Sequence, residues 1–228
     1  MRQRRKHNLD AHLERCKRFL LPTAPASSEN ALIAVQEKAY FDWSEYFPKN
    51  LPVSLEIGCG KGSFAVEFSR RNPNKNLVAV ERNANIIVSA LMAADAAEPQ
   101  PTNLLFLHSP CEVLPRYFRP GEVQEIFLNF STPLPKGPYV RQRLTHPRFL
   151  ALYQEMLAPG GKIYLKTDSQ DFFEYSKEQL AESGFAVLRA ETDLYQSDLI
   201  ENNIQTEYER RFVNMGLPIY EIIAEKKE

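Results

Sequence analysis

The sequence is short of the features that mark several large protein classes. Its three cysteines, Cys16, Cys59 and Cys111, are odd in number and far apart, which argues against a disulfide framework and a C-x-x-C zinc site. The four histidines lack metal-ligand spacing, so no metal site is expected. No apolar run approaches the roughly 20 residues that span a bilayer, and no apolar segment follows the basic first residues as in a signal peptide. We therefore expect a cytoplasmic protein without a membrane segment.

A dominant charge of one sign is also absent, since the formal net charge is −1. The basic residues are nevertheless concentrated in two stretches. Residues 1–20 carry a net +5, from Asp10 and Glu14 against Arg2, Arg4, Arg5, Lys6, Arg15, Lys17 and Arg18. The stretch between Glu125 and Glu155 has no carboxylate and carries +4, from Lys136, Arg141, Arg143 and Arg148. Either stretch alone is compatible with a solvated face, but together they favour a polyanionic partner.

The 228 residues, 43% of them hydrophobic, fit one α/β domain. From Pro52 onward, apolar runs alternate with segments of helical spacing, which is the pattern of a doubly wound parallel sheet. Strands are expected near residues 52–57, 76–81, 103–108, 124–130, 161–167, 186–191 and 219–224. Helices are expected near 63–71, 84–97, 146–157 and 170–183, with a turn at Pro159-Gly160-Gly161. We interpret residues 1–30 as a basic N-terminal arm and residues 31–228 as a single domain, with Trp43 packing in its core or lid.

A glycine-rich segment joins the first expected strand to the first expected helix, and it reads Glu56-Ile57-Gly58-Cys59-Gly60-Lys61-Gly62-Ser63. Glycine has no Cβ, so such a turn lets the backbone approach a bound ligand closely. Glu81 ends the next apolar run, where an acid can accept hydrogen bonds from both ribose hydroxyls of a nucleoside. The pattern predicts a nucleotide site.

The spacing of these glycines separates the turn from two common nucleotide motifs. The third glycine comes too early for the dinucleotide G-x-G-x-x-G, and the G-K-[ST] ending of a P-loop is missing. Glu56 would repel a pyrophosphate but could hold a cationic amino-acid group. The whole pattern resembles the S-adenosylmethionine site of class I methyltransferases, which implies a Rossmann-like, mostly parallel seven-stranded sheet with helices on both faces. The alternative is a glycine-rich turn that binds nothing.

Polar residues also follow the other expected strands. They are Glu81-Arg82-Asn83, His108-Ser109, Asn129-Phe130-Ser131-Thr132 and Asp168. Any one of them could be only a helix cap. Because ligands bind at the carboxyl ends of parallel strands, their joint placement favours a site on one rim of the sheet.

The segment Asn129-Phe130-Ser131-Thr132-Pro133-Leu134-Pro135-Lys136 carries a more specific signal. It resembles the signature N-F-[PS]-D-P-W-P-K of the bacterial tRNA (guanine-N7-)-methyltransferases. Further matches in the same order are Leu55-Glu56-Ile57-Gly58, Arg141-Gln142-Arg143-Leu144-Thr145, Lys166-Thr167-Asp168 and Thr206-Glu207-Tyr208-Glu209. The resemblance implies methylation of guanine N7 in the variable region of tRNA, with S-adenosyl-L-methionine as cofactor and tRNA as partner.

Family roles are carried over position by position. The resemblance assigns cofactor binding to Glu56, Gly58, Gly60, Glu81, Ser109 and Asn129, and substrate binding to Lys136, Asp168, Thr206 and Glu209. Thr132 stands at the catalytic position, where the family has an aspartate, and Leu134 replaces the family's tryptophan. The family's acid after the third strand is missing too, since Ser109-Pro110-Cys111 occupies that region.

The change at Thr132 bears on rate. A hydroxyl can form a hydrogen bond but cannot carry a carboxylate's charge. Guanine N7 already has a lone pair, so methyl transfer needs no base, and proximity and alignment still lower the barrier. We predict slower catalysis. Two alternatives stay open: a paralogue that binds RNA or cofactor without catalysis, and a methyltransferase with another acceptor. Monomer and homodimer are both compatible with the sequence.

Overall fold

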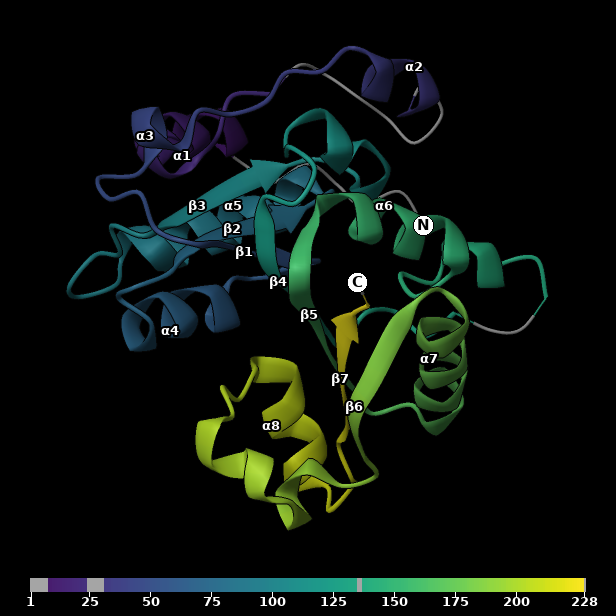
Figure 1. The fold of residues 1–228 in the computed structure, drawn as a ribbon. Coiled ribbons are helices and arrows are strands. Elements are labelled where there is room, and N and C mark those ends of the chain that lie inside the picture. Colours follow the sequence, from purple (N-terminus) through teal and green to yellow (C-terminus); the bar gives the residue numbers. More distant parts are fainter. Residues whose placement is uncertain (1–7, 24–30, 135–136, 228) are drawn as a thin grey trace.

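The computed structural model describes residues 8–23, 31–134 and 137–227, with the backbone alone for residues 31–33. The described chain forms a seven-stranded sheet in the order β3-β2-β1-β4-β5-β7-β6 (Figure 1). The strands are β1 (Val53–Ile57), β2 (Asn76–Glu81), β3 (Leu104–His108), β4 (Val123–Asn129), β5 (Leu157–Thr167), β6 (Phe185–Glu191) and β7 (Tyr220–Lys226). β7 runs antiparallel to the other six strands of this sheet, which are parallel to one another. The expected mostly parallel sheet is confirmed.

Four helices connect the strands as the sequence predicts. They are α4 (Ser63–Arg71), α5 (Ala84–Asp95), α6 (Pro147–Met156) and α7 (Gln170–Glu182). The turn expected at Pro159-Gly160-Gly161 is the main difference, because β5 already begins at Leu157 and runs through it. The pairing of β5 with β4 shifts register between Val123 and Glu125, which absorbs the irregular residues.

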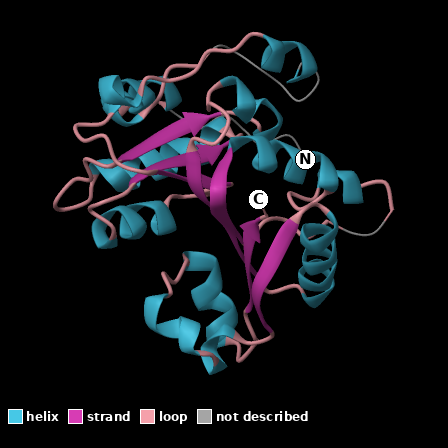
Figure 2. Ribbon diagram, viewed as in Figure 1, coloured by secondary structure: helices cyan, strands magenta, loops and turns pink. Residues whose placement is uncertain are grey.

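Helices cover both faces of the sheet (Figure 2). Alternate strand residues point to opposite faces, so Val78 and Val80 join one hydrophobic cluster while Leu77 and Ala79 join the other. The first cluster includes α6, α7 and the aromatic residues around Trp43, which is 7% exposed. The second includes α4 and α5. Trp43 packs in the core, as the sequence predicts.

The described part of the N-terminal arm packs against the sheet edge. It contains α1 (Leu9–Arg15), and two further short helices, α2 (Ala31–Gln36) and α3 (Trp43–Tyr46), follow in the chain. Cys16 is fully buried, and the backbone N–H of Leu21 donates to the carbonyl of Phe106 in β3 at 2.9 Å. Residues 1–7 and 24–30 lie outside the described residues, and the boundary at residue 30 stays a prediction.

A helix near the C-terminus was not expected from the sequence. Helix α8 (Glu207–Asn214) lies between β6 and β7, beyond the carboxyl end of β6 (Figure 1). Thr206 and Glu209 form its capping box, a pattern that a Thr-x-x-Glu sequence predicts. No helix in the described part of the chain is long and apolar enough to cross a bilayer.

Candidate active site

A cavity of about 770 Å³ opens where the carboxyl ends of the central strands meet α8. Its walls come from the glycine turn, the start of α5, the end of β4 and the first turns of α8. The lining residues are Glu56, Gly58, Cys59, Gly60, Lys61, Ser63, Phe64, Asn85, Ile86, Ser89, Asn129, Phe130, Thr132, Thr206, Glu207, Tyr208 and Arg211. Of the predicted site residues, this cavity brings together Glu56, Gly58, Gly60, Asn129, Thr132 and Thr206.

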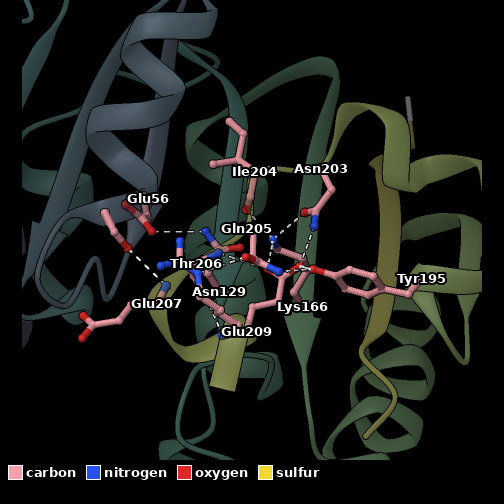
Figure 3. A network of polar contacts seen from close by, with 12 residues as sticks. Glu56, Asn129, Lys166, Tyr195, Asn203, Ile204, Gln205, Thr206, Glu207 and Glu209 are labelled. Atoms are coloured by element: carbon pink, nitrogen blue, oxygen red, sulfur yellow. Dashed lines mark hydrogen bonds and ion pairs between the residues drawn. The ribbon is translucent and has the colours of Figure 1, made fainter. Parts of the chain in front are cut away.

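Glu56 places a buried carboxylate on the cavity wall. Its side chain is 2% exposed, and Asn129 Nδ2 donates to Oε1 at 3.1 Å (Figure 3). The second oxygen, Oε2, is buried without a hydrogen-bond partner. Burial raises the pKa of Glu56 to about 7, against the opposing effects of Asn129 and Lys166. Native structures seldom leave such an oxygen unpaired, so the geometry fits a cationic ligand group at this point.

The three glycines of the turn serve two purposes. All three have positive φ, with Gly58 at 83°, Gly60 at 56° and Gly62 at 82°. A Cβ on Gly58 or Gly60 would meet nothing within 4 Å, so their backbone faces open space beside the cavity. A Cβ on Gly62 would lie 2.8 Å from the Cβ of Ala90 in α5. The first two glycines therefore leave room for a ligand, and the third lets α4 and α5 pack.

These two roles predict different effects for two substitutions, one mainly on stability and the other mainly on ligand affinity. We expect Gly62→Ala to destabilise the protein by about 3 kcal/mol, through the left-handed backbone and the clash with Ala90. We expect Gly58→Ala to cost only about 1–2 kcal/mol of stability, because the new methyl group meets no protein atom within 4 Å and only the left-handed backbone is strained. The same methyl group takes up space beside the cavity, so ligand affinity should fall at least ~10-fold. Urea unfolding and ligand calorimetry on both variants measure the two effects. Equal stability losses in the two variants would contradict this assignment.

Two predicted cofactor residues lie beside the cavity rather than in its wall. Glu81 is 9% exposed, and its Oε1 accepts a hydrogen bond from the backbone N–H of Asn83 at 2.9 Å. Ser109 is 3% exposed, and its backbone N–H donates to the carbonyl of Glu81 at 3.2 Å. The two residues are thus joined to each other at the ends of β2 and β3. Their contact with a cofactor stays a prediction.

The loop after β4 holds Thr132 at the cavity. Phe130 and Leu134 have φ angles of 50° and 43°, a left-handed conformation that non-glycine residues adopt only when their surroundings impose it. The backbone N–H of Phe130 donates to the carbonyl of Lys166 at 2.8 Å, which fixes the start of the loop to β5. Thr132 is exposed between these two residues. Lys136 lies outside the described residues, so its predicted role stays a prediction.

Arg143 fixes the other end of this loop. Its Nε and Nη2 donate to the carbonyl of Leu134 at 3.0 and 2.7 Å, and Nη2 also pairs with Asp171 at 2.8 Å. The guanidinium lies 4.6 Å from the ring centre of Tyr175, and the side chain is 2% exposed. The prediction that Arg143 belongs to a basic surface is therefore wrong, because its side chain is buried. Its Nε and Nη2 donors are used inside the protein, whereas Nη1 is buried without a hydrogen-bond partner among the described residues.

A buried ion pair joins β5 to α8. Lys166 Nζ lies 2.6 Å from Glu209 Oε2, and the two side chains are 5% and 0% exposed (Figure 3). Lys166 also donates to Asn203 Oδ1 and to the carbonyl of Ile204, both at 2.8 Å. Glu209 further accepts hydrogen bonds from the Tyr195 hydroxyl, the Asn203 amide and the backbone N–H of Thr206. Lys166 was expected only as part of the motif Lys166-Thr167-Asp168 and without a role of its own, although a lysine within an apolar strand signals a buried partner.

These contacts bear on the predicted substrate residues. Thr206 is 7% exposed and lines the cavity, with its hydroxyl accepting from the backbone N–H of Glu209 at 3.0 Å. Glu209 is fully buried inside the network, and Asp168 is half-buried after β5, away from the cavity lining. Direct substrate contacts of these residues stay predictions.

The start of α8 also touches the glycine turn. Lys61 Nζ lies 3.2 Å from the Glu207 carboxylate, and the backbone N–H of Glu207 donates to Ser63 Oγ at 3.4 Å. Both partners of the ion pair are largely exposed, so this pair adds little stability by itself. It places α8 over the same turn that lines the cavity.

The chain resembles known methyltransferases over most of its length. A family model described as "Putative methyltransferase" matches residues 50–222. The tRNA (guanine-N(7)-)-methyltransferase of Lachnoclostridium phytofermentans is 40% identical over 182 residues, covering 80% of this chain and 84% of that protein. The Bacillus subtilis protein of the same name is 38% identical over 195 residues, covering 85% and 90%. The chain belongs to the tRNA (guanine-N7-)-methyltransferase family.

Solved structures support the fold of this family member. The 16S rRNA methyltransferase KamB superimposes with a TM-score of 0.58 at 17% identity, covering 91% of this chain and 97% of that one. A SAM-dependent methyltransferase from Methanosarcina mazei gives 0.53 at 15% identity, covering 82% and 98%. At these identities the likeness concerns the fold alone. The predicted class I methyltransferase fold and the predicted family are both confirmed.

Proposed function

We propose that this protein transfers a methyl group from S-adenosylmethionine to N7 of a guanine in the variable region of tRNA. The observation that carries the proposal is the unpaired, buried Glu56 Oε2 beside the open glycine backbone. A carboxylate there suits an α-ammonium group, and glycine leaves space for the rest of an amino-acid chain. The names of the curated relatives supply the acceptor. We also propose that the protein works in the cytoplasm, where it would meet a tRNA substrate.

The residues present fit this cofactor. Glu56, held by Asn129, would bind its ammonium group, Gly58 and Gly60 would admit its chain, and Glu81 would accept its ribose hydroxyls. When bound, the cofactor supplies a methyl group activated by a sulfonium. The chain's own residues then have to position the guanine and to stabilise charge, because N7 needs no deprotonation. Thr132, exposed on the cavity wall, can donate or accept a hydrogen bond at the base.

The first experiment is methyl transfer from labelled S-adenosylmethionine to unmodified bulk tRNA, with cofactor calorimetry alongside. We expect label at N7 of a variable-region guanosine. Cofactor binding without transfer to tRNA would overturn the proposal and favour the impaired paralogue or another acceptor. A lack of both binding and transfer would remove the cofactor assignment as well. Sedimentation of the same sample distinguishes monomer from homodimer.

Thr132 gives a prediction about rate. We expect Thr132→Asp to raise kcat/KM for tRNA about 10-fold, because a carboxylate stabilises positive charge growing on the purine by roughly 1–3 kcal/mol more than a hydroxyl does. Thr132→Asn is the matched control, with a similar shape and no charge. Steady-state kinetics on both variants test the effect. If the aspartate variant gains nothing over the asparagine variant, charge at position 132 does not limit this enzyme.

A further inference from the structure

Tyr208 is a large aromatic side chain left open at the cavity. It is 60% exposed and lines the cavity together with Thr132 and Phe130. Its ring centre lies 6.3 Å from that of Phe130 and 6.0 Å from that of Phe212. The rings of Phe130 and Phe212 are nearly parallel, with an interplanar angle of 5°. These three rings, which we call the aromatic platform, combine the loop after β4 with α8.

The backbone of Tyr208 is fixed on both sides. Glu207, before it, contacts Ser63 and Lys61 at the glycine turn. Glu209, after it, is buried in the ion pair with Lys166 and closes the capping box with Thr206. A residue anchored in this way presents its side chain with little loss of freedom on binding a partner. The Tyr208 side chain is therefore exposed at a helix start whose backbone is held in place.

The cavity also lacks a second available carboxylate near Thr132. Among its described lining residues the carboxylates are Glu56 and Glu207. Glu56 is buried beside Asn129, and Glu207 pairs with Lys61. The lining also holds two cationic side chains, Arg211 and the Lys61 that pairs with Glu207. The lining therefore offers no available carboxylate to a positive charge that develops on a bound base, and the Thr132 hydroxyl and the platform are left to stabilise it. An aromatic face attracts a cation, most strongly where water is excluded.

We propose that the target guanine stacks on Tyr208 and that the platform stabilises the positive charge that methylation places on the base. This inference rests on the proposed function. The N7 lone pair forms the new bond to the methyl carbon while the carbon–sulfur bond breaks and its electron pair stays on sulfur. The positive charge leaves sulfur and arrives on the purine, and no proton is transferred. An aromatic ring stacks on any nucleic-acid base, but it attracts a cationic base more strongly than a neutral one.

The test compares Tyr208→Ala with Tyr208→Phe, and Tyr139→Ala serves as control because Tyr139 is also exposed, at 52%, but lies outside the cavity lining. Binding of guanosine and 7-methylguanosine monophosphates is measured by calorimetry at mildly acidic pH, where the methylated base keeps its positive charge. We expect the wild type, Tyr208→Phe and Tyr139→Ala to prefer the methylated nucleotide about 10-fold. Tyr208→Ala should lose this preference while keeping its affinity for S-adenosylmethionine, which shows that the fold is intact.

Kinetics provide the second readout. We expect kcat for tRNA methylation to fall about 10- to 100-fold in Tyr208→Ala, with an unchanged KM for S-adenosylmethionine and little change in Tyr208→Phe. Unchanged nucleotide preference and kcat in Tyr208→Ala would overturn the inference, and so would an equal loss in Tyr208→Phe. A wild type that prefers 7-methylguanosine but transfers no methyl group to tRNA would instead contradict the proposed function.

Discussion

Replacing Glu56 with glutamine is expected to weaken S-adenosylmethionine binding about 100-fold and to stabilise the ligand-free protein at the same time. The loss of affinity follows from removing the only charge that Glu56 offers to a cationic ligand, and a buried charge-assisted hydrogen bond contributes roughly 2–3 kcal/mol. The gain in stability follows from burial, which raises the pKa of Glu56 to about 7. The ligand-free fold therefore holds a carboxylate in a place that disfavours its ionised form.

The raised pKa of Glu56 decides how its contribution to folding stability changes with pH. A folded-state pKa above the ordinary 4.5 means that the folded protein binds the proton more tightly than the unfolded chain. The proton on Glu56 therefore stabilises the fold fully below pH 4.5, and this contribution is lost as pH rises through about 7. At 1.36 kcal/mol per pKa unit, the loss above pH 7 is at most ~3 kcal/mol. Glu56→Gln should therefore be ~2 kcal/mol more stable than wild type at alkaline pH and nearly equal at acid pH.

Urea unfolding at both pH values and calorimetry with S-adenosylmethionine measure the two effects. Cofactor affinity of the wild type should also fall below pH 7, as Glu56 becomes protonated. Glu67→Gln is the matched control, because this carboxylate lies on α4 and pairs with Arg70 and Arg71 outside the cavity. Those bonds lower the pKa of Glu67 to about 2, so its replacement should reduce stability at neutral pH and leave cofactor affinity unchanged. Undiminished affinity in Glu56→Gln would show that Glu56 does not hold the cofactor.

The central strands β1 and β2 could be predicted because they are buried on both faces. Such strands read as continuous apolar runs, as Asn76–Glu81 does, and glycine and proline mark the turns between them. The glycine turn with Glu56 was equally readable, since its chemistry lies in one short segment. Strand limits followed within a few residues, except where β5 continues through Gly160 with a change of register.

Contacts between distant segments could not be read in this way. Arg143 looked like part of a basic surface because charge alone gives no sign of burial, and its acceptor at Leu134 exists only in the folded loop. The platform likewise joins Phe130 to Tyr208 and Phe212, which the sequence separates widely. Helix α8 was missed because it is short, although its Thr-x-x-Glu start was visible. The wall of the cavity formed by the glycine turn and Glu56 could thus be predicted from the sequence. The wall formed by α8 could be identified only from the folded structure.

Breaking the buried pair between Lys166 and Glu209 should have the second large effect. We expect Lys166→Met to cost about 3–4 kcal/mol, because it leaves the Glu209 carboxylate buried without its cation. The Tyr195 hydroxyl and the Asn203 amide still donate to that carboxylate, which keeps the cost at the lower end. The exposed pair of Lys177 with Glu174 is the matched control, and Lys177→Met should cost less than about 1 kcal/mol.

Lys166→Met should loosen helix α8 locally in addition to lowering the stability of the whole protein. Lys166 also donates to Asn203 and to the carbonyl of Ile204, so its removal releases the segment that leads into α8. Hydrogen exchange should accelerate in residues 207–214 more than in β1 or β2, and kcat/KM for tRNA should fall at least ~100-fold as the cavity loses the wall that α8 forms.

The double variant Lys166→Met with Glu209→Met should recover part of the stability, because no charge is left unpaired. It should recover none of the activity if α8 needs its capping box. Full activity in Lys166→Met would mean that the position of α8 does not depend on this pair. The remaining contacts would then hold Tyr208 at the cavity: those of Glu207 with Ser63 and Lys61, and the hydrogen bonds that Tyr195 and Asn203 donate to Glu209.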